Sequence, residues 1–131
     1  MNQYNFKFID LFAGMGGLRI PFDELGGTCV FSSEWDKFAQ QTYQANFDEI
    51  PAGDITKVDK SEIPDHDILL AGFPCQAFSY AGKKLGLSDA RGTLFYEFAR
   101  VVKEVNPPIC MGENVRGLLS HDKGRTIVTF Y

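Results

Sequence analysis

Cysteine and histidine are scarce in this sequence of 131 residues, which limits the chemistry that it can support. Its cysteines, Cys29, Cys75 and Cys110, are widely spaced and form no Cys-x-x-Cys pair, and its histidines, His66 and His121, lie far apart. An odd number of distant cysteines does not suggest a disulfide framework, and such a set does not suggest a zinc site. We therefore expect a protein that has no metal centre.

Long apolar runs and a signal sequence are missing as well. No stretch approaches the roughly 20 apolar residues of a membrane span, and the first five residues, MNQYN, lack the basic and apolar sections of a signal peptide. We therefore expect a cytoplasmic protein that does not enter a membrane. A hydrophobic content of 44%, without a linker rich in proline or serine, predicts one domain with its own core.

Positive charge is deficient overall, with 13 Lys and Arg against 17 Asp and Glu, a net charge of −4. This balance argues against a nucleic-acid partner, because polyanions bind basic surfaces. The distribution changes that interpretation: residues 1–73 carry 5 basic and 12 acidic side chains, a net of −7, whereas residues 74–131 carry 8 and 5, a net of +3. A phosphate-binding surface would come from the second half, although ordinary solvated charge explains each basic residue there equally well. These residues are Lys83, Lys84, Arg91, Arg116, Lys123 and Arg125.

Short apolar runs alternate with helical patterns along the chain. Apolar runs closed by glycine or polar residues predict strands, and apolar residues at helical spacing predict helices. The predicted strands are 6–12, 28–33, 67–72 and 108–112, and the predicted helices are 18–25, 36–47 and 93–105. This order predicts an α/β protein with a doubly wound, mostly parallel sheet, whose ligands bind at the carboxyl ends of the strands. Residues from 125 onward begin a further element, so we expect a sheet that is incomplete at the C-terminus.

Three strand ends carry residues that suit a nucleoside. The glycine-rich turn DLFAGMGG at 10–17 lets the backbone approach a ligand closely, although a tight turn without a ligand explains it equally well. Glu34 lies about 20 positions further on, where dinucleotide folds bind ribose hydroxyls, and Trp35 offers a flat face for adenine unless it belongs to the core. Asp54 follows a third short extended segment and could accept a hydrogen bond from the adenine amine. Together these residues predict an adenosine pocket without a place for a pyrophosphate, which favours a nucleoside cofactor over NAD.

Cys75 follows Pro74 at the carboxyl end of the third predicted strand, a position typical of catalytic residues in α/β enzymes. No histidine lies beside it in the sequence, which disfavours a protease-like pair. Cys29 and Cys110 lie inside predicted strands, and we interpret them as small buried hydrophobic residues. Glu113 leaves the next strand, and if it faces Cys75, its carboxyl would be partly desolvated and able to donate a hydrogen bond. This pair suits addition to an aromatic ring that is activated by protonation.

These motifs, in this order and with these spacers, resemble the motifs of bacterial cytosine carbon-5 DNA methyltransferases. The matching segments are FIDLFAGMGG at 8–17, GFPCQ at 72–76 and ENV at 113–115, and the resemblance covers nearly the whole chain. It implies a Rossmann-like fold that binds S-adenosyl-L-methionine, in a cytoplasmic enzyme of a restriction-modification system that acts on duplex DNA. By this resemblance the cofactor contacts are Phe12, Glu34, Trp35, Asp54, Ile55 and Pro74, and the residues that shape its turn are Asp10, Gly14 and Gly17.

The resemblance also implies the catalytic residues Cys75, Glu113 and Asn114. Cys75 would attack carbon 6 of a cytosine swung out of the duplex, because the target atom cannot be reached inside the stack. Glu113 would hold the ring at nitrogen 3 and the exocyclic amine, while Asn114 orders the strand end. The loop 76–92 would close over DNA. Its expected DNA-binding residues are Gln76, Lys83, Lys84 and Arg91, the last of these on a phosphate.

Two departures from the family pattern keep other hypotheses open. Ala81 stands where a relative carries a serine that helps to fill the vacated stack. The Gln-x-Arg-x-Arg motif, the target-recognition domain and the closing Gly-Asn-Ser-Val segment have no counterpart in residues 1–131, which resemble only the N-terminal part of the catalytic domain. The chain could be a methyltransferase portion whose second part is lost or comes from another polypeptide. It could also be a non-catalytic remnant that binds S-adenosylmethionine or a partner, or an RNA cytosine methyltransferase.

Overall fold

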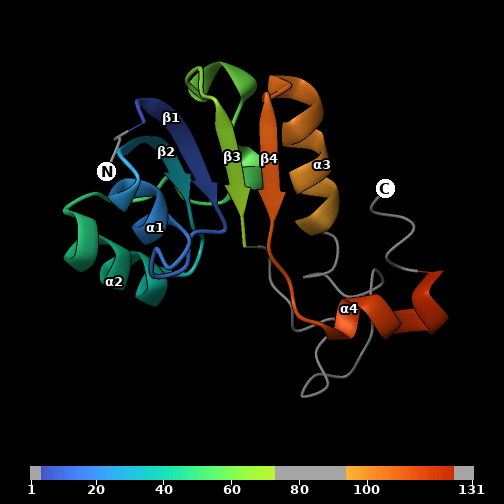
Figure 1. The fold of residues 1–131 in the computed structure, drawn as a ribbon. Helices are drawn as coiled ribbons and strands as arrows, with labels where there is room; N and C mark the ends of the chain where they lie inside the picture. Colours follow the sequence, from blue (N-terminus) through green and yellow to red (C-terminus); the bar gives the residue numbers. More distant parts are fainter. Residues whose placement is uncertain (1–3, 73–93, 126–131) are drawn as a thin grey trace.

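The computed structural model describes residues 4–72 and 94–125, whose strands form a single parallel sheet. The strands lie in the order β2-β1-β3-β4 (Figure 1). Their bounds are β1 (Phe6–Leu11), β2 (Gly27–Ser33), β3 (Ile68–Ala71) and β4 (Ile109–Gly112). A parallel sheet whose strands are connected by helical segments confirms the predicted α/β fold.

Helices occupy the three connections where the sequence pattern predicts them. They are α1 (Arg19–Glu24), α2 (Lys37–Phe47) and α3 (Leu94–Val105), and the shorter helical segments are η1 (Ile55–Lys57), η2 (Lys60–Glu62), α4 (Gly117–Ser120) and η4 (His121–Gly124). The ends of α2 show why the prediction succeeds. Asp36 caps its start, because its Oδ1 accepts a hydrogen bond from the Ala39 amide at 2.8 Å, and Asp48 ends it in the left-handed conformation with φ 55°.

The third extended segment, expected before Asp54, is only partly present. It is reduced to one bridge between Ser33 and Ala52, and the 3₁₀ helix η1 follows. Pro51 explains the short pairing, because proline has no N–H to donate to a strand ladder. The end of β2 nevertheless remains next to Asp54, because the Glu34 amide donates to the Ala52 carbonyl oxygen at 2.9 Å.

Alternate residues of β1 face opposite sides of the sheet. Ile9 and Leu11 are fully buried in a core cluster that includes Phe95 and Val101 of α3. Phe8 lies on the other side, where its ring packs against that of Phe22 in α1, with 5.7 Å between centroids. Helices therefore cover both faces near β1, which is the arrangement of a doubly wound sheet.

The strand order creates a crevice at one end of the sheet. From β1 the chain passes outward to β2 and then returns to β3 on the other side of β1. The connections that follow β1 and β3 thus leave in different directions. In open α/β sheets such a reversal opens a ligand crevice at the carboxyl ends of the strands.

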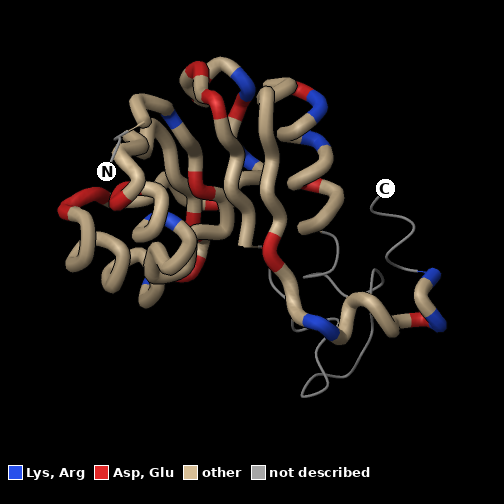
Figure 2. The backbone as a smooth tube through the Cα atoms, in the orientation of Figure 1, with Lys and Arg blue, Asp and Glu red and all other residues tan. Residues whose placement is uncertain are grey.

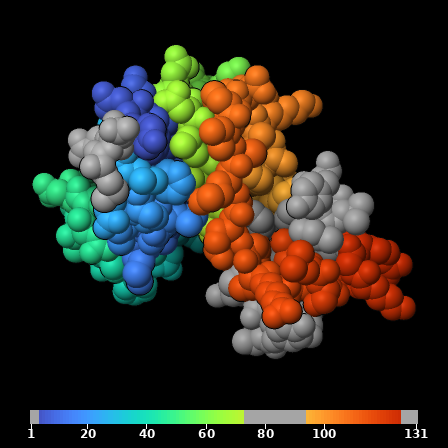
Figure 3. Space-filling model, in the orientation of Figure 1, coloured from blue at the N-terminus to red at the C-terminus, as the bar shows by residue number. Residues whose placement is uncertain are grey.

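The outer strand β4 corrects one expectation. All four of its residues are exposed, and Cys110, expected to be buried, is therefore a surface thiol. Its neighbours Ile109 and Met111 are 57% and 38% exposed, and the space-filling view shows β4 at the surface (Figure 3). The sequence pattern identified the strand correctly but not its position at the edge of the described sheet. An edge strand has a neighbouring strand on one side only, so its side chains are less covered.

Charge is distributed unevenly over the described residues (Figure 2). Residues 4–72 carry 5 Lys and Arg against 12 Asp and Glu, whereas residues 94–125 carry 5 against 4.

The described part contains no helix that is both long enough and apolar enough to span a bilayer.

Candidate cofactor site and catalytic strand end

A cavity of about 210 Å³ lies at the carboxyl ends of the strands. Its lining residues come from the segments after β1, β2 and β3, from the segment around η1 and from the start of α3. They are Phe12, Gly14, Ser33, Glu34, Trp35, Gly53, Asp54, Ile55, Gly72 and Leu94. Six of the nine residues expected around a cofactor are brought together here, namely Phe12, Gly14, Glu34, Trp35, Asp54 and Ile55. Pro74 lies outside the described residues.

The glycine-rich turn after β1 has an unusual backbone. Phe12, Gly14 and Gly16 have positive φ values of 54°, 56° and 91°. Gly16 has a steric requirement too, since a Cβ placed there would lie 2.0 Å from Cε2 of Phe47. At Gly17, by contrast, an added Cβ would meet no atom within 4 Å. Gly16, which was not among the residues expected to shape the turn, is therefore the glycine that the packing of this turn requires. The expected role of Gly17 stays a prediction.

Glu34, the residue directly after β2, connects this strand to the turn through a hydrogen bond. Its Oε2 accepts a hydrogen bond from the Gly14 amide at 2.8 Å, and its Oε1 accepts one from the Asp36 amide at 2.8 Å. A carboxylate oxygen has more than one acceptor position, so both oxygens can still accept from a ligand hydroxyl. The two amides orient the carboxylate before any ligand binds.

Trp35 and Asp54 supply an aromatic face and an acceptor on the same cavity. Trp35 is 50% exposed, so its indole is available to a ligand and is not a core residue. Asp54 Oδ1 accepts from the amide and the hydroxyl of Thr56 at 2.9 and 2.8 Å. Although desolvation acts in the opposite direction, these hydrogen bonds lower the pKa of Asp54 and keep it an anionic acceptor.

Asp10, expected to shape the turn, lies beneath it. The residue is 1% exposed, and neither carboxyl oxygen has a hydrogen-bond partner within the described residues. Burial raises the pKa of Asp10 to about 7, an effect that the positive charge of Arg19 partly offsets. Asp10 is thus a buried carboxyl whose pKa is close to neutral pH, located in β1 two residues before Phe12, where the turn begins.

Arg19 is a site residue that sequence reasoning missed. Its guanidinium is buried and bonds Asp23 at 2.9 Å, Tyr43 Oη at 3.0 Å and Glu49 at 2.8 and 3.1 Å. These bonds connect the start of α1 to α2 and to the segment after it. Its partners lie 4, 24 and 30 positions away, so the sequence alone offered only the i,i+4 spacing to Asp23 as a signal.

The catalytic end is described in part. Cys75, Gln76, Lys83, Lys84 and Arg91 lie outside the described residues. Glu113 follows β4, and its amide donates to the Ala71 carbonyl oxygen at 2.9 Å. Its Oε2 lies 3.9 Å from the position that a Cβ of Gly72 would take, so the carboxylate is next to the end of β3.

Glu113 itself is exposed. The expectation that its carboxyl becomes desolvated when it faces Cys75 stays a prediction, because Cys75 lies outside the described residues. Its place after the outer strand β4 explains the exposure. Asn114 Oδ1 accepts a hydrogen bond from the amide of the next residue, Val115, at 2.7 Å, and its expected role in ordering the strand end stays a prediction. Its Nδ2 is buried without a partner among the described residues.

Cys29 differs from a catalytic thiol. It is half-buried, and its Sγ donates to the Phe31 carbonyl oxygen at 3.4 Å. Burial raises the pKa of Cys29 to about 11, so the reactive thiolate is rare at neutral pH. Cys29 was expected to be a small buried hydrophobic residue, and the structure shows it only half-buried.

The parallel sheet with helices on both faces and a cavity at its strand ends define an α/β protein of the Rossmann-like type, and comparison with known proteins specifies the family. The model of the C-5 cytosine-specific DNA methylase family matches residues 6–131. The chain therefore belongs to the C-5 cytosine-specific DNA methylases, as its motifs predicted.

Curated relatives agree with this assignment. The chain is 60% identical over 127 residues to the Type II methyltransferase M.DsaV of Dactylococcopsis salina, with 97% of this chain and 36% of the relative covered. It is 56% identical over 121 residues to M.HhaI of Haemophilus parahaemolyticus, with 92% and 37% covered. The chain thus spans little more than a third of the length of these relatives.

Solved structures show the same fold. A putative DNA modification methyltransferase encoded in an Escherichia coli prophage is 27% identical, with a TM-score of 0.71 over 94% of this chain and 35% of that one. The Entamoeba histolytica methyltransferase EhMeth, at 17% identity, has a TM-score of 0.75 over 98% and 43%. These structures identify the sheet as that of Rossmann-like, S-adenosylmethionine-dependent methyltransferases.

Proposed function

We propose that the protein containing this chain is a DNA (cytosine-5-)-methyltransferase of a restriction-modification system. It would transfer a methyl group from S-adenosylmethionine to carbon 5 of cytosine in duplex DNA. The observation that supports this most is the cavity where Glu34, Trp35 and Asp54 meet beside the glycine-rich turn. The Type II methyltransferases to which the chain is similar supply the reaction class.

The cavity residues fit an adenosine group. Trp35 and Ile55 would contact the adenine, and Asp54 would accept from its exocyclic amine through the Oδ2 that Thr56 does not engage. Glu34 would accept from the ribose hydroxyls. Phe12, Gly14 and Pro74 would complete the contacts, with Asp10 supporting the turn from below. A set of this kind binds a nucleoside without a phosphate group.

The catalytic residues would act on the base. Bound S-adenosylmethionine supplies an electrophilic methyl group. The thiolate of Cys75 would add to carbon 6 of the flipped cytosine, which makes carbon 5 nucleophilic. Glu113 would hold nitrogen 3 and the exocyclic amine, and Asn114 would hold the strand end in place. Once carbon 5 carries the methyl group, loss of its proton restores the ring and breaks the bond between carbon 6 and Cys75.

DNA contacts would come from the segment after Cys75 and from outside this chain. Gln76, Lys83, Lys84 and Arg91 would face the DNA. Protein outside these 131 residues would recognise the target DNA sequence, and it would belong either to the same polypeptide or to a second one. Two facts support this: the relatives are nearly three times as long, and the net charge of −4 gives no long-range attraction to DNA.

Transfer of a radioactive methyl group tests the proposal. The assay compares this chain alone with the chain plus a polypeptide that carries the Gln-x-Arg-x-Arg motif, the target-recognition domain and the Gly-Asn-Ser-Val segment. We expect no transfer by the chain alone, and sequence-specific transfer to duplex DNA but not to transfer RNA by the combination. Preferred methylation of transfer RNA would overturn the proposed substrate, and specific methylation by the chain alone would overturn the proposed division of roles.

A further inference from the structure

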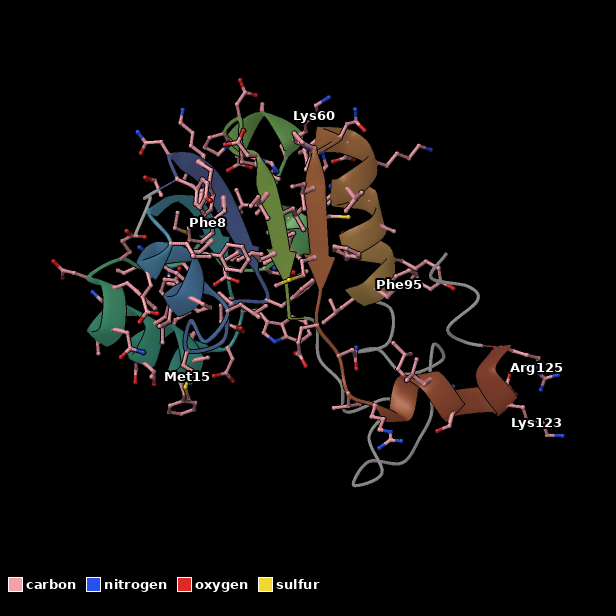
Figure 4. The ribbon with its side chains drawn as sticks, in the orientation of Figure 1. Phe8, Met15, Lys60, Phe95, Lys123 and Arg125 are labelled. Atoms are coloured by element: carbon pink, nitrogen blue, oxygen red, sulfur yellow. The ribbon has the colours of Figure 1, made fainter. Side chains whose placement is uncertain are left out.

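The last turn of α2 contacts the glycine-rich turn at residues other than the one that Glu34 bonds. Nδ2 of Asn46 donates a hydrogen bond to the Met15 carbonyl oxygen at 2.9 Å, across 31 positions of sequence. The next residue, Phe47, packs on Gly16 so closely that a Cβ there would lie 2.0 Å from its ring. Two consecutive residues of α2 thus hold two consecutive residues of the turn. The side chain of Met15 points away from the sheet at this place (Figure 4).

The end of α2 is itself firmly held. The Arg19 guanidinium lies 4.3 Å from the centroid of the Phe47 ring, and the Tyr43 ring lies 4.7 Å from it on centroids. Arg19 also bonds Glu49, two residues beyond the helix. The residues that touch the turn therefore project from a fixed support, so their contacts can set the position of the turn.

The turn needs such contacts because its own conformation is unfavourable. Phe12, Gly14 and Gly16 all have positive φ, a region that costs energy for a non-glycine residue and entropy for glycine. Glu34 accepts a hydrogen bond from the Gly14 amide, and the Ser33 carbonyl oxygen accepts one from the Ala13 amide at 2.9 Å. Asn46 adds a second side-chain hydrogen bond to this turn, which it donates to the Met15 carbonyl oxygen.

We propose that Asn46 is a positioning residue for the cofactor. It holds the Met15 carbonyl so that Phe12 and Gly14, which line the cavity, present the turn to the ligand. Asn46 itself does not line the cavity and does not touch the reacting atoms. This inference rests on the proposed function, because it takes S-adenosylmethionine as the ligand.

The test is the variant Asn46→Asp, which keeps the shape of the side chain. It replaces the donating Nδ2 group by a carboxylate oxygen, which cannot donate a hydrogen bond to the Met15 carbonyl oxygen. The matched control is Gln44→Glu, which places the same charge on an exposed residue of the same helix. Calorimetric titration of the purified protein with S-adenosylmethionine should show affinity about fivefold weaker in Asn46→Asp, as expected for one lost hydrogen bond. In the methyl-transfer assay of the combination, the KM for the cofactor should rise by the same factor with kcat unchanged. Gln44→Glu should match the parent.

The outcomes separate this inference from the proposed function. If the parent does not bind S-adenosylmethionine, the proposed function fails. If the parent binds and Asn46→Asp binds equally well, Asn46 does not position the turn. Thermal melting of each variant checks the fold, and Asn46→Ala replaces Asn46→Asp if the latter does not fold. If neither variant folds, Asn46 is required for folding, and the proposal that it positions the turn for the cofactor is overturned.

Discussion

The region from β1 to α2 and the region around β4 differ in how their charged groups are held. In the first, Arg19 is 7% exposed and has three side-chain partners, and Asp10 is 1% exposed beneath the glycine-rich turn. In the second, Glu113 is exposed, and β4 has no buried residue. The first region orients its ligand-binding groups by internal contacts. The second presents its carboxylate at the surface, where a base could reach it in the proposed function.

Replacement of Cys75 should have the largest effect and tests the proposed chemistry, to which the second region would contribute Glu113. Cys75→Ser should abolish covalent capture of duplex DNA that contains 5-fluorocytosine. In this base fluorine replaces the carbon-5 proton whose loss would release the thiol, so the parent enzyme remains bound through Cys75. The measurement is a shift in denaturing electrophoresis with the complete enzyme. Cys29→Ser and Cys110→Ser are the controls and should capture DNA as the parent does. Capture by Cys75→Ser together with its loss in either control would refute the assignment.

The buried carboxyl of Asp10 should make the first region sensitive to pH. Its folded pKa of about 7 lies above the ordinary value of 3.8, so the folded state binds the proton more tightly than the unfolded state. The contribution of Asp10 to stability is therefore fully present below pH 3.8, falls as the pH rises from 3.8 to about 7, and is constant above that. The loss should amount to a few kcal/mol at most, at about 1.4 kcal/mol per pKa unit.

Asp10→Asn removes this titration without changing the shape of the side chain. Urea unfolding at several pH values should show the variant gaining stability relative to the parent between pH 4 and 7. Asp54→Asn is a control of opposite sign in a lower pH window, because the lowered pKa of Asp54 gives stability that is fully present above pH 3.8 and is lost as the pH falls below it, so this variant should differ from the parent by a nearly constant amount between pH 4 and 7. A constant difference between Asp10→Asn and the parent over this range would show that Asp10 does not titrate as described.

Two arginines allow a direct comparison of the regions. Arg19 and Arg100 each bond two carboxylates, but the side chain of Arg19 is 9% exposed and that of Arg100 is 30% exposed. Arg19→Met should lower the free energy of unfolding by about 2 to 3 kcal/mol, because it leaves Tyr43 and two carboxylates without their buried partner. Arg100→Met should cost about 1 kcal/mol, as expected for more exposed pairs. Equal losses in urea unfolding would show that burial does not distinguish the two networks.

Local patterns predicted what is determined locally. The approximate bounds of the elements followed from apolar spacing and from glycine and polar residues that close the apolar runs, and the strand-end residues Glu34, Trp35 and Asp54 followed from the geometry of parallel sheets. These features depend on neighbours within a few positions or on a general property of the fold. The sequence therefore predicted the fold and most of the cavity lining.

What the sequence did not predict depends on contacts between distant residues. Gly16 is required only because Phe47 packs on it, and Arg19 matters only because Tyr43 and Glu49 reach it from α2 and beyond. Likewise, the exposure of Glu113 follows from the position of β4 at the edge of the described sheet and not from its apolar sequence. No periodicity in the chain encodes these relations, because each needs the packed arrangement of several elements.

The last prediction concerns the aromatic face of the cavity and sharpens the proposal that the first region binds the nucleoside. Trp35→Ala should weaken S-adenosylmethionine binding about tenfold, because an aromatic stacking contact contributes on the order of 1 kcal/mol beyond the area that it buries. Trp35→Phe keeps a flat face and should weaken binding less. Phe38→Ala is the matched control, since Phe38 is an aromatic residue of α2 that is 78% exposed and does not line the cavity. Because Trp35 is the only tryptophan, its fluorescence reports binding in the parent, while calorimetry compares the variants. Affinity that is unchanged in Trp35→Ala but reduced in Phe38→Ala would place the adenine outside the cavity, on the exposed side of α2.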